Sequence, residues 1–394
     1  MFTRQSPPVK KTLVHNTFVL ILVVGAALAF DFTNGFHDTA NSVAPTIATG
    51  ALKPRTAVAY SAVLHVIGAF LSLKVAATIA SSIVNQDLVT LPIVFGGLAG
   101  AITWNILTWY FGLPSSSSHA LVGGVVGAML ASAGTSGVIW HGIVAKVFVP
   151  GIIAPLVAVL VAGIATFVSR QATSRIDEGS RSIGMRVGQI GASGLMSIAH
   201  GTNDAQKTMG VITLALVANG TISGDAAVPN WVVVACAIAM AAGTFIGGWR
   251  IIRTLGHGLT TLDSTSGFAA QMSSAVVILT SSHLGLPLST TYVSTGAVIG
   301  TGVATRGRKV HWNTAGRVVM AWLITLPAAG CVGALAYAGE SIFGVSGGAI
   351  VVGLVVVAIA AVIFARSRKQ KIDPTNVNEP WKSELVPTEA PAAA

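Results

Sequence analysis

Long apolar runs, separated by short polar clusters, fill the chain from residue 13 to residue 365. A membrane-spanning helix needs about 20 predominantly apolar residues. Runs of this kind are predicted to span a bilayer at 13–30, 57–84, 88–111, 138–168, 228–249, 268–284, 314–338 and 345–365. Shorter apolar pieces, each beside a cluster containing polar residues, Gly or Pro, lie at 119–134, 187–199, 208–218 and 292–304. These pieces are too short to cross alone, so we predict half-helices or re-entrant segments, which are tolerated only where protein or a water-filled cavity surrounds them.

The composition strengthens this interpretation. Of the 394 residues 53% are hydrophobic and only 9% are charged, whereas an ordinary soluble domain has about 25% charged residues. Basic residues outnumber acidic ones by 23 to 13, but they lie mostly between the apolar runs and form no patch of the kind that binds nucleic acid. The composition therefore excludes a soluble enzyme, a disordered protein and a nucleic-acid binder. It predicts an all-α, multi-pass protein of the cell membrane, with the lipid bilayer as its surroundings.

The longest internal polar stretch, residues 169–186, contains four arginines and is predicted to be cytoplasmic by the positive-inside rule. It divides the chain into five segments: a polar N-terminal tail at 1–12, a first transmembrane repeat at 13–168, the arginine-rich loop at 169–186, a second transmembrane repeat at 187–365, and a polar tail at 366–394 that we expect to be disordered. Basic residues in both tails also favour the cytoplasm, but the pattern leaves the sidedness of the termini open.

The two halves of the chain repeat each other. GFHDTANSVAP at 35–45 aligns with GTNDAQKTMGV at 201–211, and residues 95–127 align without a gap with residues 268–300. Each half therefore predicts an apolar helix, a break that carries an acidic residue, further apolar helices, and then a Pro, a hydroxyl cluster and a Gly-rich half-helix. Discontinuities at corresponding places in two halves are typical of a transporter with its site near the bilayer midplane.

The first candidate site is the pair of acidic residues, Asp38 and Asp204, which the repeat superposes. A charged side chain at the bilayer centre costs at least about 2.5 kcal/mol, so a lipid-facing position is disfavoured. Side-chain amides accompany both carboxylates: Asn34, Asn41, Asn203 and Gln206. Together with backbone carbonyls freed by a break, these oxygens suit a small cation, and a carboxylate alone also suits proton relay. A helix-capping Asp in a buried loop is the alternative.

The second candidate site is a pair of hydroxyl clusters, each between a Pro and a predicted half-helix. The first comprises Ser115 to Ser118 followed by His119, and the second comprises Ser289, Thr290 and Thr291 followed by Tyr292. Free N–H groups and the positive dipole end make a helix N-terminus a binding site for anions, and hydroxyl groups add donors that can rotate to fit an oxyanion. Ordinary N-capping and hydroxyl packing between membrane helices are the alternative.

The motifs NGFHDTAN, HGTNDAQKTMG, GLPSSSSHALVG and GLPLSTTYVSTGAVIG resemble those of the inorganic phosphate transporter (PiT) family, and the similarity extends from about residue 13 to residue 365. The resemblance implies two inverted repeats, about 10–12 membrane segments, a homodimer, and symport of inorganic phosphate with protons or sodium. It implies phosphate-binding residues at Ser116, Ser117, Ser118, Ser289, Thr290, Thr291, Asn203 and Gln206, and coupling-ion or proton-binding residues at Asp38, Asn41 and Asp204. To the second set we add Lys207 as a candidate, at the repeat position of Asn41. No metal is required, although a cation could bind at Asp38 and Asp204, and no cofactor is expected.

Two departures from the family pattern bear on the coupling ion. Phe36 and His37 stand where many members have a small residue and Asn, and Lys207 stands at the repeat position of Asn41. An ammonium group should repel or replace one sodium ion, so we expect proton-coupled phosphate import through Asp38 and Asp204, with Lys207 or His37 as further candidates. A lysine that only neutralises Asp204 or snorkels is the alternative. Sodium coupling, sulfate or a metal–phosphate complex as substrate, and a phosphate-sensing receptor remain open, whereas no nucleophile–base set indicates an enzyme.

Overall fold

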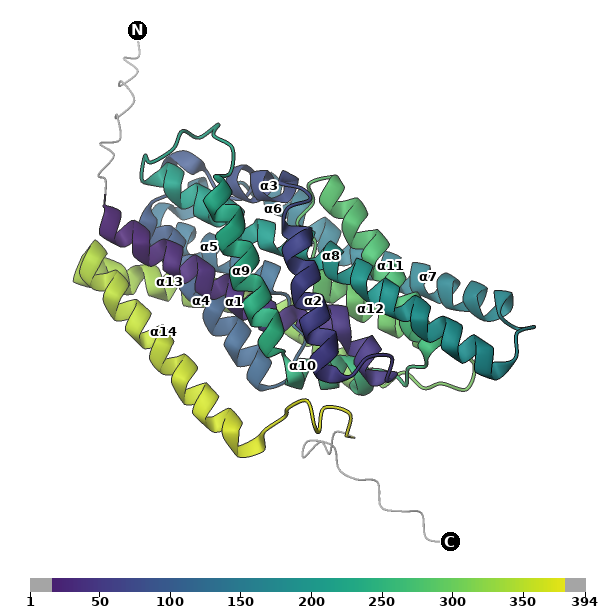
Figure 1. Cartoon of the computed structure of the whole chain (residues 1–394). Coiled ribbons are helices and arrows are strands. Elements are labelled where there is room, and N and C mark those ends of the chain that lie inside the picture. Colours follow the sequence, from purple (N-terminus) through teal and green to yellow (C-terminus); the bar gives the residue numbers. More distant parts are fainter. Residues whose placement is uncertain (1–15, 380–394) are drawn as a thin grey trace.

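The computed structural model describes residues 16–379, and the polar segment 1–12 therefore lies outside the described residues. Within this range the secondary structure is helical apart from one isolated bridge between Val84 and Val138. The α-helices are α1 (Thr17–Ala48), α2 (Pro54–Ala69), α3 (Lys74–Ser82), α4 (Leu91–Tyr110), α5 (Ser117–Ala133), α6 (Trp140–Ile143), α7 (Val149–Ala172), α8 (Glu178–Ala218), α9 (Asn230–Ile246), α10 (Trp249–Arg253), α11 (Ser264–His283), α12 (Thr290–Val303), α13 (Trp312–Phe343) and α14 (Val345–Ser367). They form one bundle, with α14 and α7 at its edges (Figure 1). The predicted all-α membrane fold is confirmed.

Within residues 16–379, six stretches of helix are long and apolar enough to cross a membrane: Thr17–Ala48, Leu91–Tyr110, Ser117–Gly137, Trp140–Ala172, Trp312–Phe343 and Val345–Gln370. Two bent pairs raise the number to eight if each pair is one span. The first pair, α2 and α3, bends by 70°, and the second, α9 and α10, bends by 61°. The number is below the expected segment count because α12 has only 14 residues and because α8 and α11 carry too many polar residues.

The bundle has two opposite faces. At the α1-start face, Asn16 contacts Ser346 at the beginning of α14, and its backbone N–H donates to Asn219 at the end of α8. At the arginine face, Arg250 donates to the carbonyl oxygens of Tyr110 at the end of α4 and Ser367 at the end of α14. The loop between α7 and α8, with its arginines, belongs to the second face. The positive-inside rule predicts a cytoplasmic location for the arginine face, which would place the beginning of α1 on the external side.

Two helical hairpins, α4–α5 and α11–α12, enter the bundle from opposite faces. α4 runs toward the arginine face and α5 returns beside α13, whereas α11 runs toward the α1-start face and α12 returns beside α7. Close approach of the backbones depends on glycine. A Cβ on Gly127 would lie 1.9 Å from the carbonyl oxygen of Gly330, and one on Gly300 would lie 2.2 Å from that of Val159. As a result, the beginnings of α5 and α12 meet inside the bundle, in the arrangement expected for inverted repeats.

The acidic motifs do not break their helices, contrary to the sequence prediction. Asp38 lies within α1, which is continuous for 32 residues, and Asp204 lies within α8, which is continuous for 41 residues and joins the pieces predicted at 187–199 and 208–218. Hydroxyl, imidazole and ammonium groups from neighbouring residues satisfy both carboxylates, so the backbone does not have to open to supply ligands. The discontinuities lie instead at the turns before α5 and α12 and at the two bent pairs.

The C-terminal segment also differs from the expectation of disorder at 366–394. α14 extends to Ser367, and the following residues to 379 pack on the arginine face. Arg250 donates to the carbonyl oxygen of Gln370 at 2.6 Å, Asn378 contacts the end of α1, and Val377 is buried. These contacts hold the first part of the tail, while residues 380–394 lie outside the described residues.

Candidate functional site

Asp38 is held between the beginnings of the two half-helices. Ser117, the first residue of α5, donates to Oδ2 of Asp38 and lies 2.7 Å from Oδ1 of Asn34. Thr291 of α12 donates to Oδ1 of Asp38 at 3.2 Å, and Nδ1 of His37 lies 2.7 Å from the same oxygen. The carboxylate therefore has partners from both hairpins, and it is 2% exposed.

Asp204 occupies the corresponding place in the second half. Thr290, the first residue of α12, donates to its Oδ2 at 2.9 Å. Lys207 donates to its Oδ1, and Nε2 of His200 lies 2.7 Å from Oδ2. His200, Asp204 and Lys207 share one face of α8 because they are four and three residues apart. Asp204 thus has an ammonium partner that Asp38 lacks.

Residues 41 and 207 connect each half to the opposite hairpin. Nδ2 of Asn41 in α1 donates to Oγ1 of Thr291 at 3.0 Å, and Nζ of Lys207 in α8 donates to Oγ of Ser118 at 2.5 Å. Lys207 also donates to the carbonyl oxygen of Leu288, in the turn before α12, at 2.8 Å. Asn41 and Lys207, one turn after the acidic residues, thus each contact the hairpin of the opposite half. The two halves differ in charge at this position.

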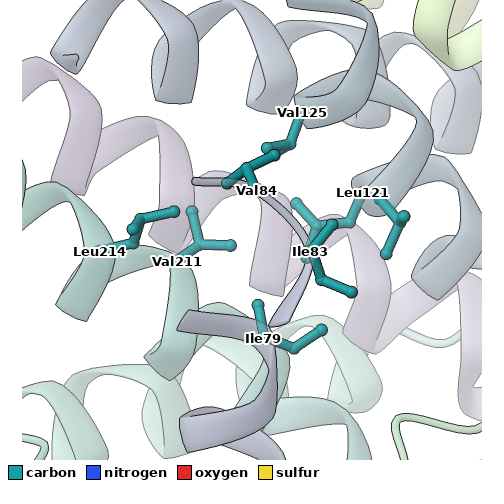
Figure 2. Close-up of a pocket in the computed structure, with 8 residues that line it drawn as sticks. Ile79, Ile83, Val84, Leu121, Val125, Val211 and Leu214 are labelled. Carbon is teal, nitrogen blue, oxygen red and sulfur yellow. The ribbon is translucent and has the colours of Figure 1, made fainter. Parts of the chain in front are cut away.

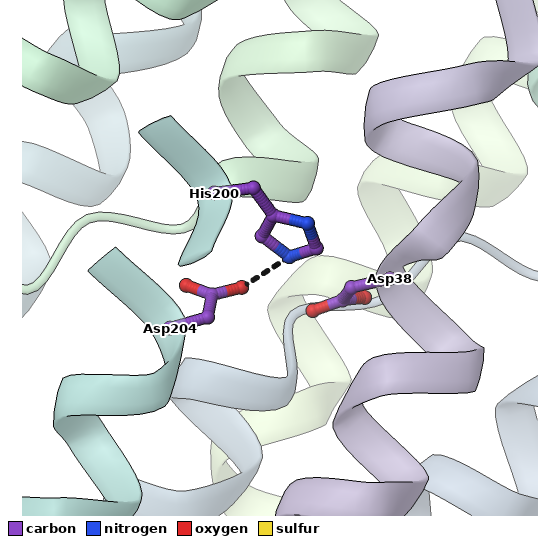
Figure 3. A group of neighbouring side chains, drawn as sticks. All are labelled: Asp38, His200 and Asp204. Atoms are coloured by element: carbon purple, nitrogen blue, oxygen red, sulfur yellow. Dashed lines mark ion pairs between the residues drawn. The ribbon is translucent and has the colours of Figure 1, made fainter. Parts of the chain in front are cut away.

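The two carboxylates and their polar partners form one central group, made up of Asp38, Asp204, His200, Lys207 and the hydroxyl residues bonded to them. This central group is closed to solvent, since Asp204 is fully buried and Lys207 is 1% exposed. Ligand atoms of Asp38, His200 and Asp204 all lie within 4.8 Å of one another, so these three residues could hold a cation (Figure 3). Lys207 changes this balance. Its ammonium group already neutralises Asp204, and a second positive charge at that carboxylate would be repelled.

Other predicted site residues have structural partners. Ser116 and Ser289 are the N-caps of α5 and α12 and accept from the backbone N–H groups of His119 and Tyr292. These two serines thus have the capping function that was the alternative interpretation.

Asn203 and Gln206 lie beside the central group in sequence but have partners elsewhere. Nδ2 of Asn203 donates to Ser282 near the end of α11 at 2.9 Å, while its Oδ1 is buried without a partner among the described residues. Gln206 accepts from the backbone N–H of Val75 at 2.9 Å and so caps the beginning of α3. The structure therefore places Gln206 in a helix-capping arrangement.

His200 and His65 belong to the group, although sequence reasoning assigned neither. Nδ1 of His200 lies 3.0 Å from Nε2 of His65 in α2, whose Nδ1 lies 2.8 Å from Oγ1 of Thr244. The spacing of four residues between His200 and Asp204, in a helix, was the available signal for His200. Nothing in the chain pattern indicated His65, because its partners come from other helices.

A stack of rings covers the group next to the two half-helices. His119 of α5 and Tyr292 of α12, which hold corresponding repeat positions, stack at 4.8 Å with an interplanar angle of 13°. Trp322 of α13 stacks on Tyr292 at 4.1 Å, and its Nε1 donates to the carbonyl oxygen of Pro114 in the turn before α5. The rings thereby tie the two hairpins to α13.

On the side of the α1-start face, the group is bordered by an apolar pocket lined by Ile79, Ile83, Val84, Leu121, Val122, Val125, Val211 and Leu214 (Figure 2). Leu121 and Val211 lie one helical turn beyond Ser117 and Lys207. The lining consists only of aliphatic side chains, which offer phosphate no hydrogen-bonding groups. We infer that this side is closed to phosphate in the arrangement described.

On the arginine face, Asp263 caps α11 and forms ion pairs with Arg170 of α7 and Arg308, each at 2.7 Å. Burial alone would raise the pKa of Asp263, but hydrogen bonds from Ser266 and the neighbouring arginine charges lower that pKa to about 2. Asp263 is therefore ionised throughout the neutral range. Its ion pair with Arg170 joins the arginine-rich loop between the repeats to the beginning of the second hairpin.

Comparison with known proteins agrees with this architecture. The family described as the phosphate transporter family matches residues 34–182 and 169–333. The chain belongs to the phosphate transporter family. A probable low-affinity inorganic phosphate transporter of Mycobacterium bovis is 56% identical over 370 residues, which cover 94% of this chain and 89% of that protein. One of Bacillus subtilis with the same description is 40% identical over 321 residues, covering 80% and 96%.

Among solved structures, a sodium-dependent phosphate transporter has the same fold, with a TM-score of 0.74 at 23% identity, over 82% of this chain and 99% of that one. These comparisons confirm the resemblance to the phosphate transporters and the multi-pass location in the cell membrane. They also confirm that the chain is a member of a transporter family, not an enzyme.

Proposed function

We propose that this protein imports inorganic phosphate in symport with protons, by alternating access. The observation that carries the choice of protons is the ion pair between Lys207 and Asp204. In the first half the corresponding position holds the neutral Asn41, whose buried Oδ1 has no hydrogen-bond partner among the described residues and could serve as a cation ligand. In the second half a fixed ammonium group takes the place of a cation, and the remaining titratable partners of the carboxylates are imidazoles, which suit protons.

Phosphate would bind where the two half-helices begin. Ser117, Ser118, Thr290 and Thr291 bring hydroxyl donors from both hairpins to the same place. In the structure these hydroxyl groups donate to the carboxylates or accept from Asn41 and Lys207. A hydroxyl group can rotate toward a phosphate oxygen once protonation of a carboxylate removes its competing acceptor. Proton binding and phosphate binding would then favour each other, as symport requires.

Alternating access would follow from the opposite orientation of the hairpins. Toward the α1-start face the central group is closed by the aliphatic side chains that line the pocket. Toward the arginine face, the ring stack and the ion pairs of Asp263 connect the surrounding helices. Rocking one repeat against the other about the half-helix ends would open one side while the second stayed closed. With the α1-start face placed outside, as the positive-inside rule predicts, import would begin by separation of α5 from α3 and α8.

Uptake by purified protein in sealed liposomes tests the proposal, with the pH gradient and the sodium gradient imposed separately. Phosphate accumulation that follows an inside-alkaline gradient in the absence of sodium is the expected result. Accumulation that requires sodium and ignores the pH gradient would refute proton coupling. Protein that binds phosphate but accumulates none would refute transport and favour a receptor.

Sodium coupling is the second candidate, and one observation favours it. Asp38, Asp204 and His200 can reach a common ion, and the structural relative is described as sodium-dependent. Sodium would require Lys207 to turn away from Asp204 or to lose its proton. The same liposome experiment decides between the two ions. Competition of labelled phosphate by sulfate tests the choice of anion.

A further inference from the structure

A carboxyl group outside the site described above lies deep in the bundle. Asp31 of α1 is fully buried, and its Oδ1 accepts from Oγ1 of Thr208 in α8 at 2.9 Å. Its Oδ2 is buried without a hydrogen-bond partner among the described residues. Its other polar neighbours are Asn34 and Cys236 of α9. Among the described residues no basic side chain is paired with Asp31, and its polar partners Thr208, Asn34 and Cys236 are all uncharged, so nothing compensates a negative charge there.

The position of Asp31 connects it to the central group. It precedes Asp38 by seven residues, which is two helical turns or about 10 Å along α1. Asn34 lies between the two and accepts from Ser117, which also donates to Asp38. On α8, Thr208 follows Lys207 directly. A chain of hydroxyl, amide and carboxyl groups therefore runs from Asp31 to the site.

From the central carboxylates, this series of polar groups extends toward the face that we place outside. From Asp31 outward, residues 17–30 of α1 contain no ionisable side chain, and neither do residues 208–218 at the end of α8. The pocket on the same side of the site is aliphatic and offers no proton acceptor (Figure 2). Asp31 is consequently the ionisable carboxyl group that α1 and α8 place between the central carboxylates and the external side.

We propose that Asp31 is a proton-binding residue through which external protons reach Asp38 and Asp204. This inference rests on the proposed proton coupling. The titratable groups of the packed helices that interact with Asp31 are Asp204 of α8 and Cys236 of α9. Lys207 of α8 is paired with Asp204, and on α1 His37 and Asp38 follow Asp31 by six and seven residues. Asp204 interacts electrostatically with Asp31, so the charge states of the two carboxyl groups are coupled.

The test compares net uptake with phosphate exchange in liposomes that contain the Asp31→Asn variant. Net uptake driven by a pH gradient needs proton delivery, whereas exchange of internal for external phosphate without a gradient needs none. We expect net uptake to fall at least tenfold while exchange stays within twofold of the wild type. Asp31→Glu, which keeps a carboxyl group, should restore a large part of the net uptake. Asp225→Asn, the same change in the external loop before α9, is the control.

Three outcomes would overturn the inference. Net uptake equal to wild type in Asp31→Asn would make Asp31 a purely structural hydrogen-bonding group. Equal loss of uptake and exchange in folded protein would place Asp31 in phosphate binding or in the conformational change. Failure of Asp31→Glu to restore any uptake would exclude a carboxyl-specific role. Failure of the proposed function is seen separately, in the wild type, as uptake that ignores the pH gradient.

Discussion

Replacement of Lys207 by Asn should convert the second half of the site into a copy of the first. Lys207 is 1% exposed and is bonded to Asp204, Ser118 and the carbonyl oxygen of Leu288. Its removal leaves Asp204 without its ammonium partner in a water-excluded group. An amide at this position offers an oxygen ligand instead, as Asn41 does in the first half. The variant should therefore recruit a cation from solution.

The magnitude follows from the burial of the pair. Breaking a fully buried ion pair by removing one partner costs about 3–5 kcal/mol. Asp204 keeps Thr290 and His200 as partners at its other oxygen, so the lower end applies. If the unpaired charge of Asp204 opposes binding of the phosphate anion by about 3 kcal/mol, the apparent phosphate affinity falls roughly 100-fold, at about 1.4 kcal/mol per factor of ten. The loss should appear in the absence of sodium.

The assay is phosphate uptake into proteoliposomes at neutral pH, with and without sodium. Wild type should be insensitive to sodium, whereas Lys207→Asn should take up phosphate poorly without sodium and recover by at least tenfold with it. Lys207→Met, of similar length but without charge or oxygen, should remain inactive under both conditions. A Lys207→Asn variant that folds and transports like wild type without sodium would refute the reasoning.

Three further predictions concern the carboxylates, the packing and the arginine face. Asp38→Asn and Asp204→Asn should each abolish uptake while the proteins still insert and elute as folded species, because each removes a carboxylate that we propose binds protons. Normal uptake by both variants would contradict the mechanism. Gly127→Ala should destabilise the protein by about 1–3 kcal/mol, since its Cβ would meet the Gly330 carbonyl oxygen at 1.9 Å. The control is Gly184→Ala, whose Cβ would have nothing within 4 Å and which should be neutral or stabilising. Thermal unfolding in detergent measures both effects. Asp263→Asn should lower the unfolding temperature by a similar amount at every pH from about 5 to 8, and the difference should vanish only toward the pKa of about 2. The reason is that a carboxylate with a lowered pKa stabilises the folded state above its unfolded-state pKa and loses this effect as the pH falls. A difference that changed between pH 5 and 8 would argue against the ion pairs.

Much of this protein could be predicted from the sequence, because its signals are local. A bilayer imposes a minimum length on each apolar run, so α4, α9, α13 and α14 were found close to their observed bounds. An internal repeat can be recognised within a single sequence, so the correspondence of Asp38 with Asp204 required no structure. The Pro and hydroxyl clusters before α5 and α12 also mark true helix starts, since Ser116 and Ser289 accept from backbone N–H groups that a helix leaves free.

Tertiary structure decided how the polar residues are satisfied. Charged motifs inside apolar flanks suggested breaks in the helices, but α1 and α8 stay continuous because partners from α5 and α12 reach the carboxylates. Gln206 caps α3, and His65 joins His200, through contacts between residues more than 100 positions apart. Such pairings have no period or spacing in the sequence. They depend on the close approach of helices at glycine, which only the packed bundle determines.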